Sequence, residues 1–163
     1  MKLKLDFVTK VPKVAKDSEV ILIKDKSTNN KIVKSLNKLI FTNKLFLERK
    51  FLIQNLNGKI YIFVNCTKSK TSLDYEKLGS NLFLFLKNNK IENSFFETNL
   101  SKITNIQLEK FLHGAQLKSY EFNVYKTDKS KNLTTNLYVV GHKTKKTSEL
   151  RKKLNSILDG VFL

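Results

Sequence analysis

Short apolar runs alternate with longer amphipathic stretches along this chain of 163 residues. Residues 3–7 alternate apolar and charged side chains, which predicts an edge strand with one buried face and one solvated face. Continuous apolar runs predict strands that are covered on both faces. These and shorter runs predict further strands at residues 20–23, 45–47, 51–53, 60–64, 95–96 and 137–140. The dipeptide Asn57-Gly58 predicts a tight turn before the run at 60–64.

The longer stretches repeat apolar residues at the spacing of a helix that packs one face on a core. Helices are expected at residues 29–41, 72–87, 105–120 and 148–163. Ser72 is expected to cap the second helix, and Asn88 with Asn89 can adopt the left-handed backbone that ends it. Before the third helix, Thr104 and Gln107 have the spacing of a capping box.

Strands that alternate with helices predict an α/β fold, with layers of helix around a mostly parallel sheet. The length fits one ordinary domain with a sizeable core. The single cysteine, Cys66, excludes an intramolecular disulfide and favours a reducing compartment. No apolar run approaches the about 18 residues that span a bilayer. We therefore expect a soluble cytoplasmic protein with no membrane contact.

The formal net charge of +17 favours polyanionic partners, because clustered lysines displace counterions from a phosphate backbone. Only Arg49 and Arg151 among the 31 basic residues are arginines, although the guanidinium group fits phosphates and base edges better. The lysines are also spread along the predicted elements instead of forming one block. A solvated basic surface is favoured, and contact with DNA or RNA remains open.

Few residues carry chemistry that could form a site. Glu109 and His113 lie four residues apart and can share one helix face, but two ligands alone hold a metal poorly. His113 is therefore expected to be a surface or half-buried side chain that pairs with a carboxylate. His142 follows an apolar strand at its exit into a loop. Cys66 follows a strongly apolar run, which predicts a packed and not a reactive thiol. No local motif joins either histidine to a nucleophile, so the roles of all three residues stay open.

The aromatic side chains of Tyr120, Phe122 and Tyr125 could stack on bases, with Lys118 and Lys126 beside them. Their alternation with polar residues instead predicts that at least two of the rings pack back on the domain. The favoured interpretation is an aromatic latch that fixes the end of the third helix and a strand that follows it.

A family resemblance rests on the same part of the chain. The third helix carries a small Gly114-Ala115 pair and runs into Tyr-Glu-Phe-Asn-Val-Tyr-Lys-Thr at 120–127. The chain ends with Leu-Asp-Gly-Val-Phe-Leu at 158–163. This order resembles the end of the N-terminal domain of the leucyl aminopeptidases, a family of cytosolic metallo-exopeptidases. The family has a small-residue turn after the strand at 60–64, whereas this chain has Asn-Cys-Thr-Lys at 65–68.

The resemblance implies a macro-domain-like three-layer sandwich with a mixed, mostly parallel sheet. Residues 1–146 would form the N-terminal domain, and residues 147–163 a helix that leads to a catalytic domain. In the family that catalytic domain binds two divalent metals, zinc or manganese, through motifs that do not occur in this sequence. The resemblance therefore implies no catalytic, cofactor-binding or metal-binding residue in this chain. Its partners would be its own catalytic domain and the sister subunits of the family's hexamer.

The resulting expectation is a non-catalytic domain that shapes access to an aminopeptidase active site and helps to assemble the hexamer. The alternative is a stand-alone basic module that binds DNA or RNA, which an oligonucleotide titration across a salt series would distinguish. A further function follows from the fold, since macro domains bind ADP-ribose through glycine-rich loops. The five glycines of this chain stand singly, so no phosphate-binding loop is expected.

Overall fold

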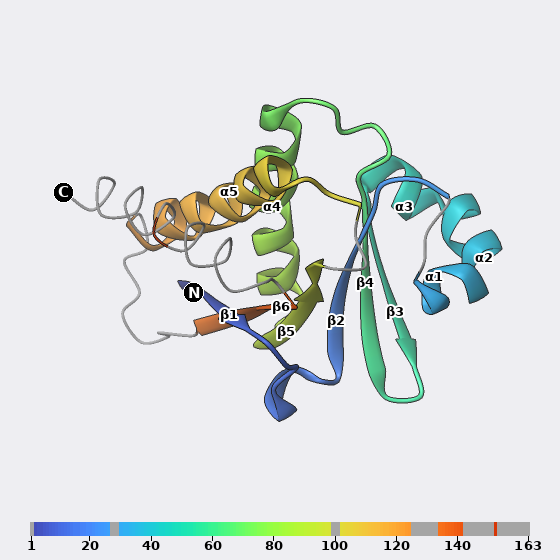
Figure 1. Cartoon of the computed structure of the whole chain (residues 1–163), viewed down its shortest axis with the longest axis horizontal. Coiled ribbons are helices and arrows are strands. Elements are labelled where there is room, and N and C mark those ends of the chain that lie inside the picture. The colour runs from blue at the N-terminus through green and yellow to red at the C-terminus, as the bar shows by residue number, and fades with distance from the viewer. Residues whose placement is uncertain (1, 27–29, 99–101, 125–133, 142–151, 153–163) are drawn as a thin grey trace.

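A six-stranded mixed sheet forms the centre of the molecule in the computed structural model, which describes residues 2–26, 30–98, 102–124, 134–141 and 152 (Figure 1). The strands are β1 (Lys2–Val8), β2 (Ser18–Ile23), β3 (Phe51–Leu56), β4 (Lys59–Asn65), β5 (Asn93–Glu97) and β6 (Thr134–Val140). Their spatial order is β1-β6-β5-β2-β4-β3, and every neighbouring pair is parallel except β3 with β4. The expected α/β fold with a mixed, mostly parallel sheet is confirmed.

Helices cover both faces of this sheet (Figure 1). They are the 3-10 helix η1 (Lys13–Ala15) and the α-helices α1 (Lys31–Ser35), α2 (Asn37–Thr42), α3 (Lys44–Arg49), α4 (Ser72–Asn88) and α5 (Asn105–Val124). One core lies between the sheet and the helices α4 and α5, where Phe83, Phe96 and Phe111 are buried. A second core lies under α1, α2 and α3 and contains Val33 and Phe46. None of the described helices is long and apolar enough to cross a membrane.

Two glycines let α4 and α5 cross in direct backbone contact. A Cβ atom on Gly79 would lie 1.8 Å from the carbonyl oxygen of Phe111, and one on Gly114 would lie 1.9 Å from that of Glu76. The hydroxyl group of Ser80 lies 3.0 Å from the Gly114 carbonyl oxygen and adds a hydrogen bond across the crossing. Gly114, which belongs to the small-residue pair of the sequence, therefore has a packing role.

Most of the predicted strands are confirmed. The runs at 3–7, 20–23, 51–53, 60–64, 95–96 and 137–140 lie within β1, β2, β3, β4, β5 and β6. The turn between β3 and β4 is also confirmed, because Asn57 and Gly58 both have a positive φ, 52° and 84°. A two-residue turn of this kind matches the twist of the strands that it joins.

The prediction of a strand at 45–47 is wrong, because these residues form the middle of α3. The Asn43 side chain accepts a hydrogen bond from the Phe46 amide (3.2 Å) and starts the helix. Only Phe46 is buried, while Leu45 and Leu47 are 50% and 49% exposed. A short apolar run does not by itself distinguish a strand from a single helical turn.

The single helix expected at 29–41 is instead a pair of short helices, α1 and α2, separated at Leu36. Leu36 has φ −105° and ψ 13°, outside the helical range. The Asn30 side chain accepts from the amides of Ile32 (3.0 Å) and Val33 (3.3 Å) and so fixes the start of α1. Both short helices still place an apolar side chain on the sheet.

The third helix continues beyond its expected end at Tyr120 to Val124, so the aromatic segment begins as helix. The strand preference of aromatic residues is weak, and each residue that continues a helix adds a backbone hydrogen bond. The capping box at the other end is confirmed. The Thr104 amide donates to Gln107 Oε1 (3.1 Å), and the Gln107 amide donates to Thr104 Oγ1 (3.2 Å).

The ends of α4 differ by a residue or two from the sequence prediction. Thr71 and not Ser72 is the N-cap, and it forms a capping box with Asp74. The left-handed residue after the helix is Lys90 (φ 55°) and neither of the two asparagines before it. Threonine caps a helix nearly as well as serine, so the local pattern does not separate Thr71 from Ser72. The exact terminal residue of a helix is likewise not fixed by the local pattern to better than a residue or two.

Several predictions lie outside the described residues. They concern the helix at 148–163 apart from Lys152, the boundary at 146–147, and the residues Tyr125, Lys126, Thr127, His142 and Gly160.

Candidate functional site

The carboxyl ends of β2 and β5 form the switch point of the sheet. After β2 the chain moves to β3 and β4 on one side, whereas after β5 it moves to β6 on the other side. Ligands of open α/β sheets bind in the crevice that such a reversal leaves. The two strands also diverge, since only two residue pairs join them, Glu19 with Phe95 and Val20 with Phe96. This gap is therefore the first candidate for a binding site.

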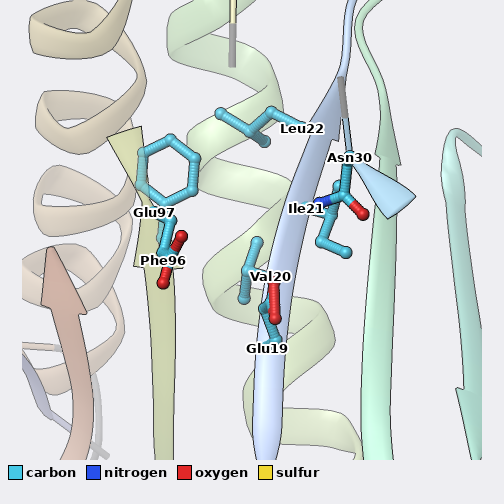
Figure 2. Close-up of a pocket in the computed structure, with 7 residues that line it drawn as sticks. All are labelled: Glu19, Val20, Ile21, Leu22, Asn30, Phe96 and Glu97. Carbon is cyan, nitrogen blue, oxygen red and sulfur yellow. The ribbon is translucent and has the colours of Figure 1, made fainter. Parts of the chain in front are cut away.

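A small hollow lies in the gap between β2 and β5 (Figure 2). Its lining residues are Glu19, Val20, Ile21, Leu22, Asn30, Phe96 and Glu97. It offers about 10 Å³ to the centre of a water molecule, which is room for about one water. The Asn30 side chain is already used, because its oxygen accepts from two amides at the start of α1. A hollow of this size does not accommodate a nucleotide.

Glu19 is a buried charged group beside this hollow. Its carboxylate accepts from the Nζ atom of Lys59 at 3.2 Å. The same ammonium group lies 4.9 Å from the ring centroid of Tyr61 and 5.1 Å from that of Phe95. Burial raises the pKa of Glu19, and the attraction of Lys59 does not cancel this effect, to which Glu97 adds. The ion pair therefore holds a carboxylate that is easier to protonate than one in water.

Glu19→Gln is expected to raise the free energy of unfolding at neutral pH. Because the pKa of Glu19 is raised in the folded state, the wild type loses stability as the pH rises from the ordinary value of 4.5 through the folded value. The variant has no such loss, so its advantage should be small near pH 4 and larger near pH 7 in urea unfolding. Glu48→Gln, on the exposed surface of α3, corrects for the change in net charge. An advantage that shrinks as the pH rises would contradict this assignment.

Asn65 closes the loop after β4 with its own side chain. Its Nδ2 donates to the Phe46 carbonyl oxygen (3.1 Å), and its Oδ1 accepts from the amide (2.9 Å) and the hydroxyl group (2.6 Å) of Thr67. The Thr67 amide therefore already has a hydrogen-bond partner within the chain. In a glycine-bearing turn, by contrast, free backbone amides could bind a phosphate. The departure of 65–68 from the family pattern thus has a structural reason.

Lys24 joins the loops that follow β2 and β5. Its Nζ lies 3.3 Å from the carbonyl oxygen of Lys102 and 3.4 Å from Oε1 of Gln107 at the start of α5. Lys102 in turn pairs with Asp25, with 3.7 Å between the charged atoms. These contacts hold the carboxyl edge of the sheet together with side chains of the chain itself.

Those candidate residues of the sequence that the structure describes do not converge on one site. His113 lies on α5 with Glu109, and both of its buried ring nitrogens lack a hydrogen-bond partner within the described ranges. The expected pairing of His113 with a carboxylate is therefore wrong for this part of the chain. Cys66 is packed as predicted, with its Sγ 3.9 Å from the Val64 carbonyl oxygen, and burial raises the pKa of its thiol to about 12. Among the described residues, no three His, Cys, Asp or Glu side chains are grouped to hold a metal.

Glu19, Lys59 and Asn65 were not identified from the sequence. Glu19 and Lys59 each stand immediately before an apolar run, at 20–23 and 60–64, so both open a buried strand. In the parallel register Glu19 lies opposite Tyr61, two residues after Lys59, so the two charges meet diagonally across the strand pair. The strand order that makes β2 and β4 neighbours is not visible in the sequence pattern.

Comparison with known proteins identifies a fold and not a family. No protein-family model matches the chain, and no curated protein matches it either. Among solved structures, a mutant of tomato leucine aminopeptidase is similar over 99% of this chain and 37% of its own, with a TM-score of 0.67 and 15% identity. A mutant macrodomain from Oceanobacillus iheyensis is similar over 96% of this chain and 93% of its own, with a TM-score of 0.53 and 11% identity.

The chain spans only 37% of the length of the aminopeptidase, and the part that matches is the N-terminal region. Identities of 15% and 11% show the fold alone. The macro-domain-like architecture that the resemblance implied is therefore confirmed, and this chain has the fold of the N-terminal region of the tomato enzyme.

Proposed function

We propose that this chain is the N-terminal accessory domain of a cytoplasmic, leucyl aminopeptidase-like metallo-exopeptidase. In this proposal the enzyme hydrolyses the first peptide bond of its substrate with two divalent metals, zinc or manganese, that are bound in a separate catalytic domain. The domain itself is not catalytic. It shapes access to the active site and contributes to the assembly of subunits, which is a hexamer in the family that the sequence resembles.

The main support for this proposal is structural: 99% of this chain matches part of the tomato leucine aminopeptidase. The sequence resemblance supports it through a different feature, the Gly114-Ala115 pair, whose glycine lies at the contact of α4 and α5. The carboxyl edge of the sheet also supports it. An α/β domain would bind a small ligand at the loops of this edge. Here Asn65 and Lys24 form hydrogen bonds within the chain in these loops.

The native polypeptide provides the test. Immunoprecipitation from source cells with an antibody against the 163-residue chain should recover it together with a catalytic domain. That domain can be part of one polypeptide larger than 18.9 kDa or a separate bound chain. The recovered material should hydrolyse a leucyl amide, lose this activity to a chelator and regain it with zinc or manganese.

The purified 163-residue chain is the matched control and should release no amino acid with either metal. Hydrolysis by this purified chain that survives a contaminant control would refute the non-catalytic role. Recovery of an 18.9 kDa polypeptide alone, without aminopeptidase activity, would remove the whole proposal.

A stand-alone DNA- or RNA-binding function is the second candidate, and the net charge of +17 is the observation that favours it. Three lysines near the sheet make contacts within the chain: Lys24 with Gln107, Lys59 with Glu19, and Lys102 with Asp25. Contacts within the chain therefore already occupy these three ammonium groups, which weakens the case for nucleic-acid binding at this surface. The oligonucleotide titration across a salt series separates it from the first proposal.

A further inference from the structure

The two edges of the sheet differ in their protection against pairing with another strand. β1 carries Lys4 and Asp6, and charges on an edge strand oppose edge-to-edge association. β3 has the sequence Phe-Leu-Ile-Gln-Asn-Leu, with no charge and no proline. An uncharged edge strand with this many apolar residues is a template for a further strand.

The hairpin of β3 and β4 determines which backbone groups of β3 face outward. The two-residue turn at 57–58 makes Leu56 and Lys59 a hydrogen-bonded pair, and such pairs alternate along an antiparallel ladder. The Asn65 amide donates to the Lys50 carbonyl oxygen at 2.8 Å, at the place where this alternation requires another such pair. The odd-numbered residues of β3 therefore turn their backbone groups away from β4.

The outward residues of β3 are Phe51, Ile53 and Asn55. Within the described part of the chain, no hydrogen bond reaches their outward N–H and C=O groups. Ile53 is 38% exposed and Asn55 is also exposed, so described residues do not cover the edge. The helix α3 packs on β3 and exposes two further apolar side chains, Leu45 and Leu47.

We propose that β3 pairs antiparallel with β3 of a second copy of this chain, about a two-fold axis at Ile53. In this register Ile53 lies opposite Ile53, and Phe51 lies opposite Asn55. All three outward residues then form hydrogen-bonded pairs, with about six bonds in total. The two sheets become one continuous sheet across the axis.

A second copy fits this edge because the strand is its own complement. The same three positions face outward in both copies, and no like charges meet within the paired strands. The two half-exposed Ile53 side chains lie on the same face of the joined sheet and bury each other. The inference does not depend on the proposed aminopeptidase function.

Sedimentation velocity of the full chain over a concentration series tests the proposal. We expect a species of twice 18.9 kDa that increases with concentration, and with salt, because two copies of charge +17 repel each other. Ile53→Lys should raise the dissociation constant at least about tenfold while circular dichroism shows an intact fold. Ile106→Lys is the matched control at an exposed isoleucine of α5 and should leave the dimer unchanged.

Cysteine cross-linking tests the register. Opposed residues of a hydrogen-bonded pair have Cα atoms about 5.5 Å apart, within reach of a disulfide, so Ile53→Cys should give a covalent dimer on oxidation. Asn55→Cys should not, because its symmetry mate lies about four residues, or roughly 13 Å, further along the strand. The wild type should also remain uncross-linked, because Cys66 is buried.

Three results would overturn the proposal. They are a monomer at every concentration and salt, a dimer that Ile53→Lys leaves intact, and cross-linking at Asn55→Cys as efficient as at Ile53→Cys.

Discussion

Gly114→Ala is expected to lower the free energy of unfolding by about 3 kcal/mol or more. The new Cβ would lie 1.9 Å from the Glu76 carbonyl oxygen, whereas real Cβ contacts stay beyond 3.0 Å. One helix backbone would have to move by about 1 Å, which opens the core that α4 and α5 share with the sheet. This loss outweighs the gain of about 1 kcal/mol that alanine has over glycine inside a helix. Gly79→Ala should behave in the same way.

Urea unfolding measures this effect. Asn81→Ala, at an exposed position of α4, is the control and should stay within about 0.5 kcal/mol of the wild type. A Gly114→Ala protein that is too unstable to accumulate agrees with the expected direction. If that variant were as stable as the control, α4 and α5 could not cross in backbone contact.

Alkylation of Cys66 is expected to be at least about a thousandfold slower in the folded protein than in concentrated urea. Burial raises the pKa of this thiol from 9.0 to about 12, although Lys24 and Lys50 act in the opposite direction. Near pH 8 a rise of this size lowers the thiolate fraction by about a factor of a thousand, and the buried Sγ is also shielded from the reagent. Mass spectrometry of samples quenched over time measures the rate.

The signal is unambiguous because the chain contains one cysteine. A peptide with the sequence of residues 64–68 is the control and should react at the rate of the unfolded chain. Folded protein that reacts within about tenfold of this peptide would contradict the burial of Cys66.

The strands and the long helices could be predicted from the sequence because their causes are local. A buried strand requires a continuous apolar run, as in Val20 to Ile23, whatever its partners are. The capping box of Thr104 and Gln107 likewise involves two side chains three residues apart. The asparagine-glycine turn at 57–58 needs only the left-handed backbone that these residues tolerate.

The wrong predictions concern segments in which the local pattern is ambiguous. Leu45, Phe46 and Leu47 form a short apolar run that fits a strand or a helical turn, and only the position of Phe46 under the sheet decides that they form a helical turn. The segment after Tyr120 has strand-forming aromatics, yet it continues a long helix that packing has already stabilised. In both cases contacts distant in sequence outweigh a weak local preference.

The candidate site was much less predictable than the fold. Glu19 and Lys59 are forty residues apart and meet only because β2 and β4 pair in parallel. Asn65 connects α3 with the loop after β4 through three hydrogen bonds that no spacing rule describes. His113 shows the converse, since its spacing from Glu109 suggested a shared role that the side-chain positions do not support.

The sequence alone therefore determined the α/β class, most of the strands, the long helices and the packed state of Cys66, because each follows from the burial of nearby residues. Only the tertiary structure decided the strand order, the contact of Gly79 and Gly114 with the facing helices, and the uncharged edge at β3. Strand order and helix contact arise between segments that are distant in the chain. Their energies depend on which surfaces meet, and a periodic pattern does not record that choice.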